Sequence, residues 1–195
     1  MDLPLSVLSQ VAAILEQHGI RYVLVGSFAS SIHGMYRATA DIDIVADIKE
    51  QQVHTLCEAL QNDFYVDEQA MRDAVIQRRS FNAIHFDSVF KVDFFIPKSD
   101  DFGMSELDRR QLIKISPERD EAVYVATAED TILAKLRWFR AGNETSINQW
   151  NDVVGILGTS HPNLDFNYLR TWANELGLIS LLQKALEDAQ DDSTI

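Results

Sequence analysis

The hydrophobic and polar positions of this chain follow a helical period first, then a mixture of strand and helical periods, and finally a helical period alone. Apolar residues recur every three or four positions up to Gly19, which predicts an amphipathic helix over 4–18. The apolar run 21–25 predicts a buried strand, and 27–33 predicts a short helix that starts directly after a Gly-Ser pair. The predicted order is therefore strand, tight turn, helix.

Both periods continue as far as about residue 125. Alternation predicts strands over 41–46, 80–86, 89–96, 111–115 and 122–125, and helical spacing predicts helices over 49–60 and 66–79. The polar, turn-rich segment 98–103 predicts a loop. Thr127 and Asp130 have the spacing of a capping box at the start of a helix. Further helices are predicted over 146–157, 165–176 and 178–189.

These elements indicate an α/β protein (α+β in the sense of a mixed sheet) with two parts. Residues 1–125 form the α/β core, a short mixed sheet flanked by helices, and residues 126–195 form a helical part that we expect to pack on that core. The chain has 195 residues, of which 46% are hydrophobic and 24% charged, so it is long enough to bury a real core.

The charge balance limits the partners that we expect. A formal net charge of −13 argues against a protein that grips DNA or long RNA by bulk electrostatics. No apolar run approaches the ~20 residues that would span a bilayer, the amino terminus lacks the pattern of a signal peptide, and Cys57, the only cysteine, has no internal partner. We therefore expect a cytoplasmic protein without a membrane segment.

A pair of carboxylates is the strongest chemical signal. Asp41 and Asp43 alternate with β-branched residues, so both lie on one face of a strand. Neighbouring carboxylates repel unless a cation lies between them, and Mg²⁺ or Mn²⁺ held by one or two carboxylates and substrate phosphates is a common solution in nucleotidyl transfer. On strand 89–96, Asp93 shares a face with Lys91 and can add a third carboxylate. A separation of more than ~8 Å between Asp93 and Asp41 would be too wide for one shared two-metal site.

Gly26 and Ser27 complete the pattern of a nucleotide site. A glycine lets the backbone approach a phosphate closely, the helix that follows offers unpaired N–H groups, and the serine adds a hydroxyl donor. Together with the carboxylates, this pair predicts a seat for a triphosphate.

Simpler interpretations exist for each feature. A Gly-Ser pair is often an ordinary turn, an isolated Asp-x-Asp is common on exposed strands, and Asp93 can simply pair with Lys91. The five histidines and single cysteine show no zinc-ligand spacing, the aspartates do not follow an EF-hand loop, and Ser27 lacks the sequence pattern of a hydrolase nucleophile. The combined spacing favours the nucleotide site.

The string Val25-Gly26-Ser27, a spacer of thirteen residues and Asp41-Ile42-Asp43-Ile44 resembles the signature of the polymerase-β-like nucleotidyltransferase superfamily. Residues 24–43, with His33-Gly34 and Arg37 to Ala40, are similar to the AbiEii-type branch, which includes toxins of bacterial toxin–antitoxin systems. The resemblance covers roughly residues 20–157 and implies a nucleotidyltransferase core.

The resemblance also implies roles for individual residues. Asp41, Asp43 and Asp93 would hold the metal, and Asp93 would accept the proton of the attacking hydroxyl. Lys135, or less firmly Arg37, would neutralise charge on the triphosphate, and Asp152 on the next helix would accompany Lys135. From the residues alone, 135–140 is more typical of a solvated basic face, and Asp152 of an ion-pair partner.

The predicted reaction moves a nucleoside monophosphate from an NTP to a hydroxyl acceptor. The acceptor stays open between an RNA or tRNA end, a protein and a small molecule. Two alternatives also stay open: a non-catalytic module that binds a nucleotide or a protein on the same fold, and a toxin whose acidic surface contacts a basic antitoxin.

Overall fold

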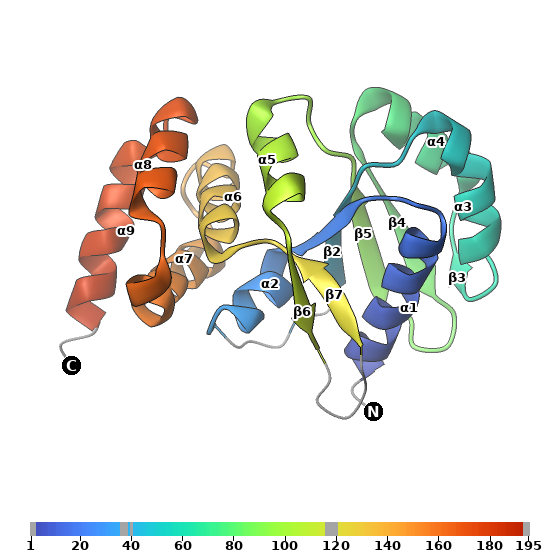
Figure 1. Cartoon of the computed structure of the whole chain (residues 1–195), viewed down its shortest axis with the longest axis horizontal. Coiled ribbons are helices and arrows are strands. Elements are labelled where there is room, and N and C mark those ends of the chain that lie inside the picture. Colours follow the sequence, from blue (N-terminus) through green and yellow to red (C-terminus); the bar gives the residue numbers. More distant parts are fainter. Residues whose placement is uncertain (1–2, 36–38, 40, 116–120, 193–195) are drawn as a thin grey trace. The chain divides into compact units, whose positions relative to one another are not determined.

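The computed structural model describes residues 3–35, 39, 41–115 and 121–192 (Figure 1). The chain divides into two compact units, one of Met1–Val25 with Thr39–Ala126 and one of Gly26–Ala38 with Thr127–Ile195. The second unit combines residues from Thr127 onward with residues 26–38, which the sequence analysis assigned to the α/β core.

The first unit is built on a seven-stranded mixed sheet with the strand order β3-β4-β5-β2-β1-β7-β6. Its strands are β1 (Tyr22–Val25), β2 (Asp41–Ala46), β3 (Phe64–Tyr65), β4 (Ser80–His85), β5 (Lys91–Phe95), β6 (Gln111–Lys114) and β7 (Ala122–Val125). The pairs β1–β7 and β2–β5 are parallel, and the other four are antiparallel. The prediction of an α/β protein with a mixed sheet is confirmed.

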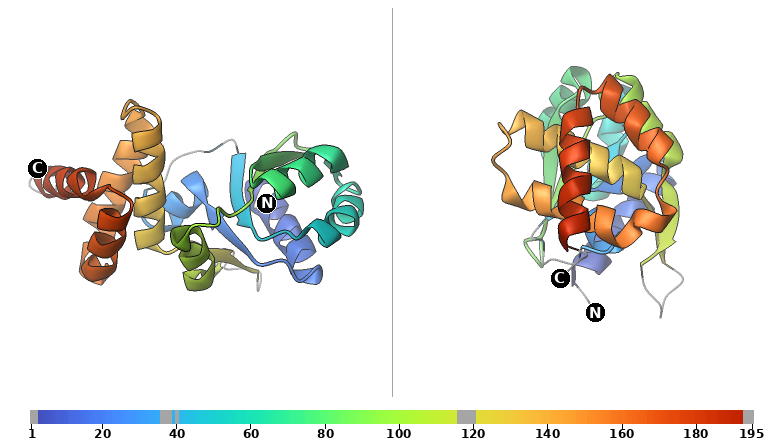
Figure 2. Two further views of the ribbon diagram at one scale, coloured as in Figure 1. Left: turned by 90° about the horizontal axis from the view of Figure 1, so that it is seen from above. Right: turned by 90° about the vertical axis from the view of Figure 1, so that its left-hand side faces the viewer.

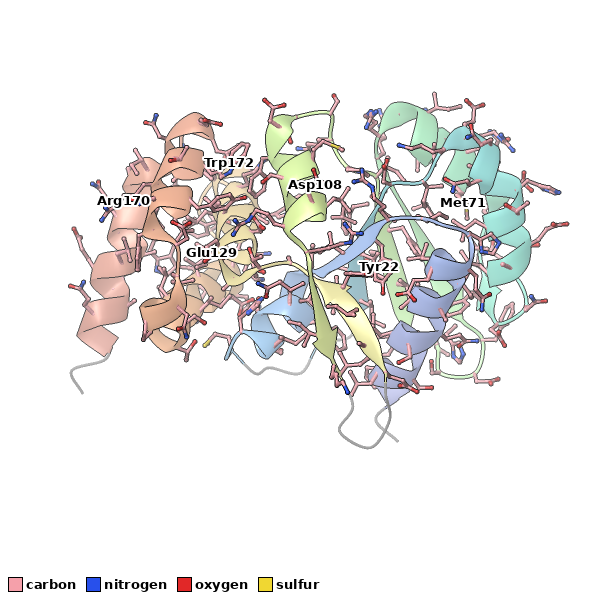
Figure 3. The ribbon with its side chains drawn as sticks, viewed as in Figure 1. Tyr22, Met71, Asp108, Glu129, Arg170 and Trp172 are labelled. Carbon is pink, nitrogen blue, oxygen red and sulfur yellow. The ribbon has the colours of Figure 1, made fainter. Side chains whose placement is uncertain are left out.

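Helices flank this sheet. They are α1 (Leu3–Gln17), α3 (Val53–Leu60) with the short 3₁₀ turn η1 (Glu50–Gln52) before it, α4 (Glu68–Gln77) and α5 (Asp101–Arg109). Helices α1, α3 and α4 pack beside one another, α1 against β7 and α4 against β4 (Figure 1). Tyr22 and Met71, both labelled in Figure 3, are among the largest fully buried side chains of this unit.

The alternation of the strands gives the sheet two unlike faces. On β2, Ile42 and Ile44 are fully buried while the residues between them are partly exposed, and β5 repeats the pattern with Val92 and Phe94 buried. On the opposite face, Val45 packs with a small cluster that includes a leucine of α5. The apolar end of that face is therefore covered, whereas the aspartates of β2 stand beyond the cluster.

One predicted loop is wrong. The segment 98–103 contains the start of α5, because the carboxylate of Asp100 accepts a hydrogen bond of 2.8 Å from the backbone N–H of Gly103 and caps the helix. A short polar run is typical both of a turn and of a helix start, and the buried Phe102 and Leu107 decide in favour of the helix. The two-residue strand β3 is too short to be seen in the pattern of the sequence.

The regular elements of the second unit are all helices among the residues that the structure describes. Its elements are α2 (Gly26–Ile32), α6 (Ala128–Ala141), α7 (Ile147–Ser160), the 3₁₀ turn η2 (His161–Asn163), α8 (Phe166–Glu175) and α9 (Ile179–Asp192). Helix α6 packs against α7 and α8, α9 packs against α7 and α8, and α2 packs against α6 and α7 (Figure 2). The four predicted helices beyond residue 125 are confirmed, with ends shifted by up to three residues.

Candidate functional site

The three predicted metal ligands lie on one face of the first unit's sheet. Asp41 and Asp43 alternate with the buried Ile42 and Ile44, so their side chains point away from the core. Strands β2 and β5 are parallel neighbours, and their register pairs Asp43 with Asp93. Since adjacent strands are only ~4.8 Å apart, two carboxylates stand side by side across the strand pair.

A lysine closes this arrangement. Lys91 is the register partner of Asp41, and its Nζ lies 2.6 Å from Oδ2 of Asp93 and 3.7 Å from Oδ2 of Asp41. Because one ammonium contacts both carboxylates, they converge well within the ~8 Å expected of a shared site. The sequence suggested that Lys91 pairs with Asp93, but its second contact with Asp41 follows only from the parallel register.

Electrostatics explain why the ammonium is held there. The pKa of Lys91 is raised, first by its hydrogen bond with Asp93 and further by the charges of Asp93, Asp41 and Asp43, while partial burial opposes the rise. Thr39 contacts the other carboxylate oxygen of Asp41, since its hydroxyl donates a hydrogen bond to Oδ1 of Asp41 at 3.2 Å. This face of the sheet thus carries three carboxylates whose charges all act on the one Lys91 ammonium.

Gly26 and Ser27 belong to the second unit, at the point where the chain leaves β1 and enters α2. Gly26 has a φ of +67°, a left-handed value that favours glycine over any residue with a Cβ, so its place between strand and helix is conformationally required. Ser27 is buried, and its carbonyl accepts a hydrogen bond of 3.0 Å from the Ser31 hydroxyl. The predicted strand, turn and helix are all present.

Lys135 and Asp152 form a buried ion pair inside the second unit. Their side chains are 4% and 3% exposed, Nζ lies 2.6 Å from Oδ2 of Asp152, and Nζ also donates to the side-chain oxygen of Gln149 at 3.3 Å. The alternative of a solvated basic face is therefore wrong for Lys135, because the face of α6 that carries it is covered by α7. The pairing of a lysine on one helix with an aspartate on the next matches the pattern that the resemblance implies.

The second unit holds a further polar cluster that the sequence analysis did not assign to a site. The carboxylate of Asp130, fully buried, accepts hydrogen bonds of 2.6 Å from the Tyr168 hydroxyl and 2.8 Å from the Thr127 hydroxyl. Glu129, labelled in Figure 3, accepts from the backbone N–H of Asp165 at 2.9 Å. In the sequence, the only sign of this cluster was the capping spacing of Thr127 and Asp130. That spacing indicated the start of a helix but not that the two side chains are buried.

Arg37, the second candidate for a triphosphate contact, lies outside the described residues. Within the described ranges, no set of three or more His, Cys, Asp or Glu side chains is arranged so that it could hold a metal ion. Among those same residues, no helix is both long and apolar enough to cross a membrane.

Comparisons with known proteins give a likeness of fold and none of sequence. The chain matches no family profile, and no curated protein matches it. An antigenic nucleotidyltransferase-like protein from Paracoccidioides brasiliensis is similar in structure, with a TM-score of 0.55 and 18% identity over 94% of this chain and 91% of that protein. A candidate nucleotidyltransferase from Thermotoga maritima has a TM-score of 0.51 and 17% identity, over 78% of this chain and 96% of its own. The chain thus has a nucleotidyltransferase fold.

Proposed function

We propose that this protein is a metal-dependent nucleotidyltransferase that moves a nucleoside monophosphate from an NTP to a hydroxyl acceptor. One observation carries the proposal: the parallel pairing of β2 and β5 gathers Asp41, Asp43 and Asp93 on a single face of a nucleotidyltransferase fold. A fold alone does not specify an activity, whereas a set of carboxylates on an exposed face of that fold suits a definite chemistry.

The donor chemistry of Asp41, Asp43 and Asp93 suits Mg²⁺ or Mn²⁺, although their present arrangement, with Lys91 in contact with two of them, is not that of a formed metal site. The donors are all carboxylate oxygens, which hard divalent cations prefer, and Mg²⁺ usually takes only one or two carboxylates and completes its shell with water and substrate phosphates.

In the proposed reaction, the acceptor hydroxyl oxygen bonds to the α-phosphorus of the NTP, the bond to the β-phosphate breaks, and pyrophosphate leaves. Asp41 and Asp43 would hold the divalent ion, with Asp93 as a further ligand. Asp93, whose carboxylate is one-fifth exposed, takes the proton of the hydroxyl. The ion, when bound, neutralises phosphate charge and lowers the pKa of the attacking hydroxyl.

The triphosphate is proposed to contact Gly26 and Ser27, with Lys135 or Arg37 as the cation that stabilises its charge. For Gly26, the support is a left-handed φ of +67°, which favours glycine, where the chain passes from β1 into α2. For Lys135, the support is the family resemblance, and its burial against Asp152 favours a positioning role for the pair.

The acceptor is an RNA or tRNA end, a protein or a small molecule. The net charge of −13 disfavours bulk binding of DNA or long RNA and leaves a single RNA end possible. The AbiEii-like residues 24–43 further suggest a toxin with an antitoxin partner. A small protein encoded beside this one, and slow growth on expression that disappears in Asp41→Ala, would support that finer proposal.

A non-catalytic module is the second candidate, and a specific observation favours it. Lys91 already neutralises part of the charge of Asp93 and Asp41, which a fold that works without a divalent ion would need. The two candidates differ in their response to nucleotide and metal.

The test is thermal stabilisation by each NTP with and without Mg²⁺, in the wild type and in Asp41→Asn/Asp43→Asn. A ligand that binds only the folded state at one hundred times its dissociation constant adds about 2.7 kcal/mol of stability. We expect a metal-dependent rise in melting temperature that the double variant loses. Asp87→Asn, in the exposed turn after β4, is the matched control and should respond like the wild type.

A nucleotide preference seen in this assay would identify the base and allow a search for acceptors with labelled NTP. No stabilisation by any NTP, or equal stabilisation in the double variant, would contradict the enzyme and favour the non-catalytic module.

A further inference from the structure

Lys91 lies where the proposed metal would have to bind. Its Nζ is 2.6 Å from Oδ2 of Asp93 and 3.7 Å from Oδ2 of Asp41, so a single compact charge contacts a carboxylate of β5 and a carboxylate of β2. A divalent ion that used the same two oxygens would stand within a few ångströms of the ammonium. At ~4 Å, like charges repel strongly enough to matter even in a well-solvated site.

We propose that Lys91 is an internal counter-cation that occupies the carboxylate site of the metal-free protein and that a divalent ion must displace. The inference rests on the proposed function, because it concerns the same three carboxylates. It assigns to Lys91 a role in setting the metal affinity, which neither the fold nor the sequence resemblance describes.

The geometry allows such an exchange. The Lys91 side chain is 41% exposed, as is that of Asp41, so the ammonium has a path to solvent on the same face. Lysine carries its charge on a flexible four-carbon stem, and its ammonium keeps three donors that water can satisfy after it leaves. The displaced side chain therefore needs no change of the backbone of β5.

The pairing also explains how three carboxylates remain together before a metal arrives. Asp43 and Asp93 are register partners, and without a cation their repulsion would oppose the pairing of β2 with β5. Thr39 fixes Oδ1 of Asp41 by a hydrogen bond of 3.2 Å and leaves Oδ2 toward Lys91. The lysine thus keeps the ligands in place and lowers their affinity for the ion that replaces it.

The experiment measures binding of Mn²⁺ by isothermal titration calorimetry in the absence of nucleotide. In Lys91→Met, which keeps the length of the side chain and removes its charge, we expect binding about tenfold tighter than in the wild type, a change of about 1.4 kcal/mol. Lys49→Met is the matched control, because Lys49 pairs with Asp47 at the same distance of 2.6 Å and away from the three carboxylates. It should leave the Mn²⁺ affinity unchanged.

A second readout uses melting temperature. Without metal, Lys91→Met should melt below the wild type, since its carboxylates lack a counter-charge, and saturating Mn²⁺ should raise its melting temperature by more than that of the wild type. Lys91→Gln replaces Lys91→Met if the latter does not fold. Adding Asp41→Asn/Asp43→Asn to either Lys91 variant should abolish the tighter Mn²⁺ binding, which would assign that binding to the carboxylates of β2.

The outcomes separate this inference from the proposed function. Equal or weaker Mn²⁺ binding in Lys91→Met, with wild-type binding that depends on Asp41 and Asp43, overturns the role of Lys91 and leaves the metal site standing. Mn²⁺ binding in neither protein overturns the role of Lys91, and the stabilisation by NTP with Mg²⁺ then decides the proposed function separately. Tighter binding in Lys91→Met and also in Lys49→Met would show a general effect of net charge and overturn the specific role.

Discussion

The buried pair of Lys135 and Asp152 offers the sharpest test of the second unit. Asp152→Asn preserves the shape of the side chain and removes its charge, so the Lys135 ammonium stays 4% exposed without its countercharge. Breaking a buried ion pair by removal of one partner costs about 3–5 kcal/mol, and we expect the lower end because Asn keeps an acceptor. For a chain of this length, that corresponds to a fall of roughly 6–12 °C in melting temperature.

Urea unfolding followed by tryptophan fluorescence measures this loss selectively. All three tryptophans, Trp138, Trp150 and Trp172, belong to the second unit, so their emission reports on the helices that carry the pair even if the two units unfold separately. Far-ultraviolet circular dichroism of the same samples reports on the whole chain, and a difference between the two transitions would reveal separate unfolding.

Two further variants complete the test. Glu144→Gln breaks the exposed pair of Glu144 with Arg140 in the same unit, whose side chains are 46% and 44% exposed, and should cost less than about 0.5 kcal/mol. Lys135→Met/Asp152→Leu removes both buried charges and should recover most of the stability lost in Asp152→Asn. A loss below about 1 kcal/mol in Asp152→Asn, or a double variant less stable than the single one, would refute the reasoning.

Three other predictions concern separate parts of the chain. The pKa of His54 is raised, first by its hydrogen bond with Glu68. The charged His54 therefore stabilises the fold fully below the ordinary histidine pKa near ~6.5, and this contribution is lost as pH rises through the raised pKa. NMR titration should place the His54 pKa above the ordinary value in the wild type and closer to it in Glu68→Gln. Thr127→Ala removes the N-cap of α6 and a donor to a buried carboxylate, and denaturant unfolding should show a loss of about 2 kcal/mol, with Thr127→Ser restoring most of it. In Gly155→Ala, the new Cβ would meet the sulfur of Met35, so the Met35 side chain must move. Alanine also stabilises a helix relative to glycine, so we compare this variant with Gly158→Ala on the same helix, whose new Cβ would meet nothing within 4 Å. We expect the lower melting temperature in Gly155→Ala, and equal values would refute the close contact.

Much of the secondary structure was predictable because its causes are local. The three- and four-residue spacing before Gly19 and the alternation around Asp41 determine which side of each element is apolar, whatever the element later packs against. The segment 98–103 was not predictable in the same way, since a polar run can form a turn or cap a helix and only the burial of Phe102 decides between them.

The candidate site likewise has features with local causes and features that depend on tertiary contacts. By itself, the sequence determined that Asp41 and Asp43 share a strand face and that a Gly-Ser pair joins a strand to a helix, because a period of two residues and the freedom of glycine at positive φ are properties of the chain near those positions. Only the tertiary structure decided that β2 pairs in parallel with β5, which sets Asp93 beside Asp43 and brings the Lys91 ammonium between carboxylates. It also decided that Lys135 is buried. Strand partners and helix contacts join residues far apart in the chain, and the free energy that selects them comes from burial and charge pairing across that separation, which no local pattern contains.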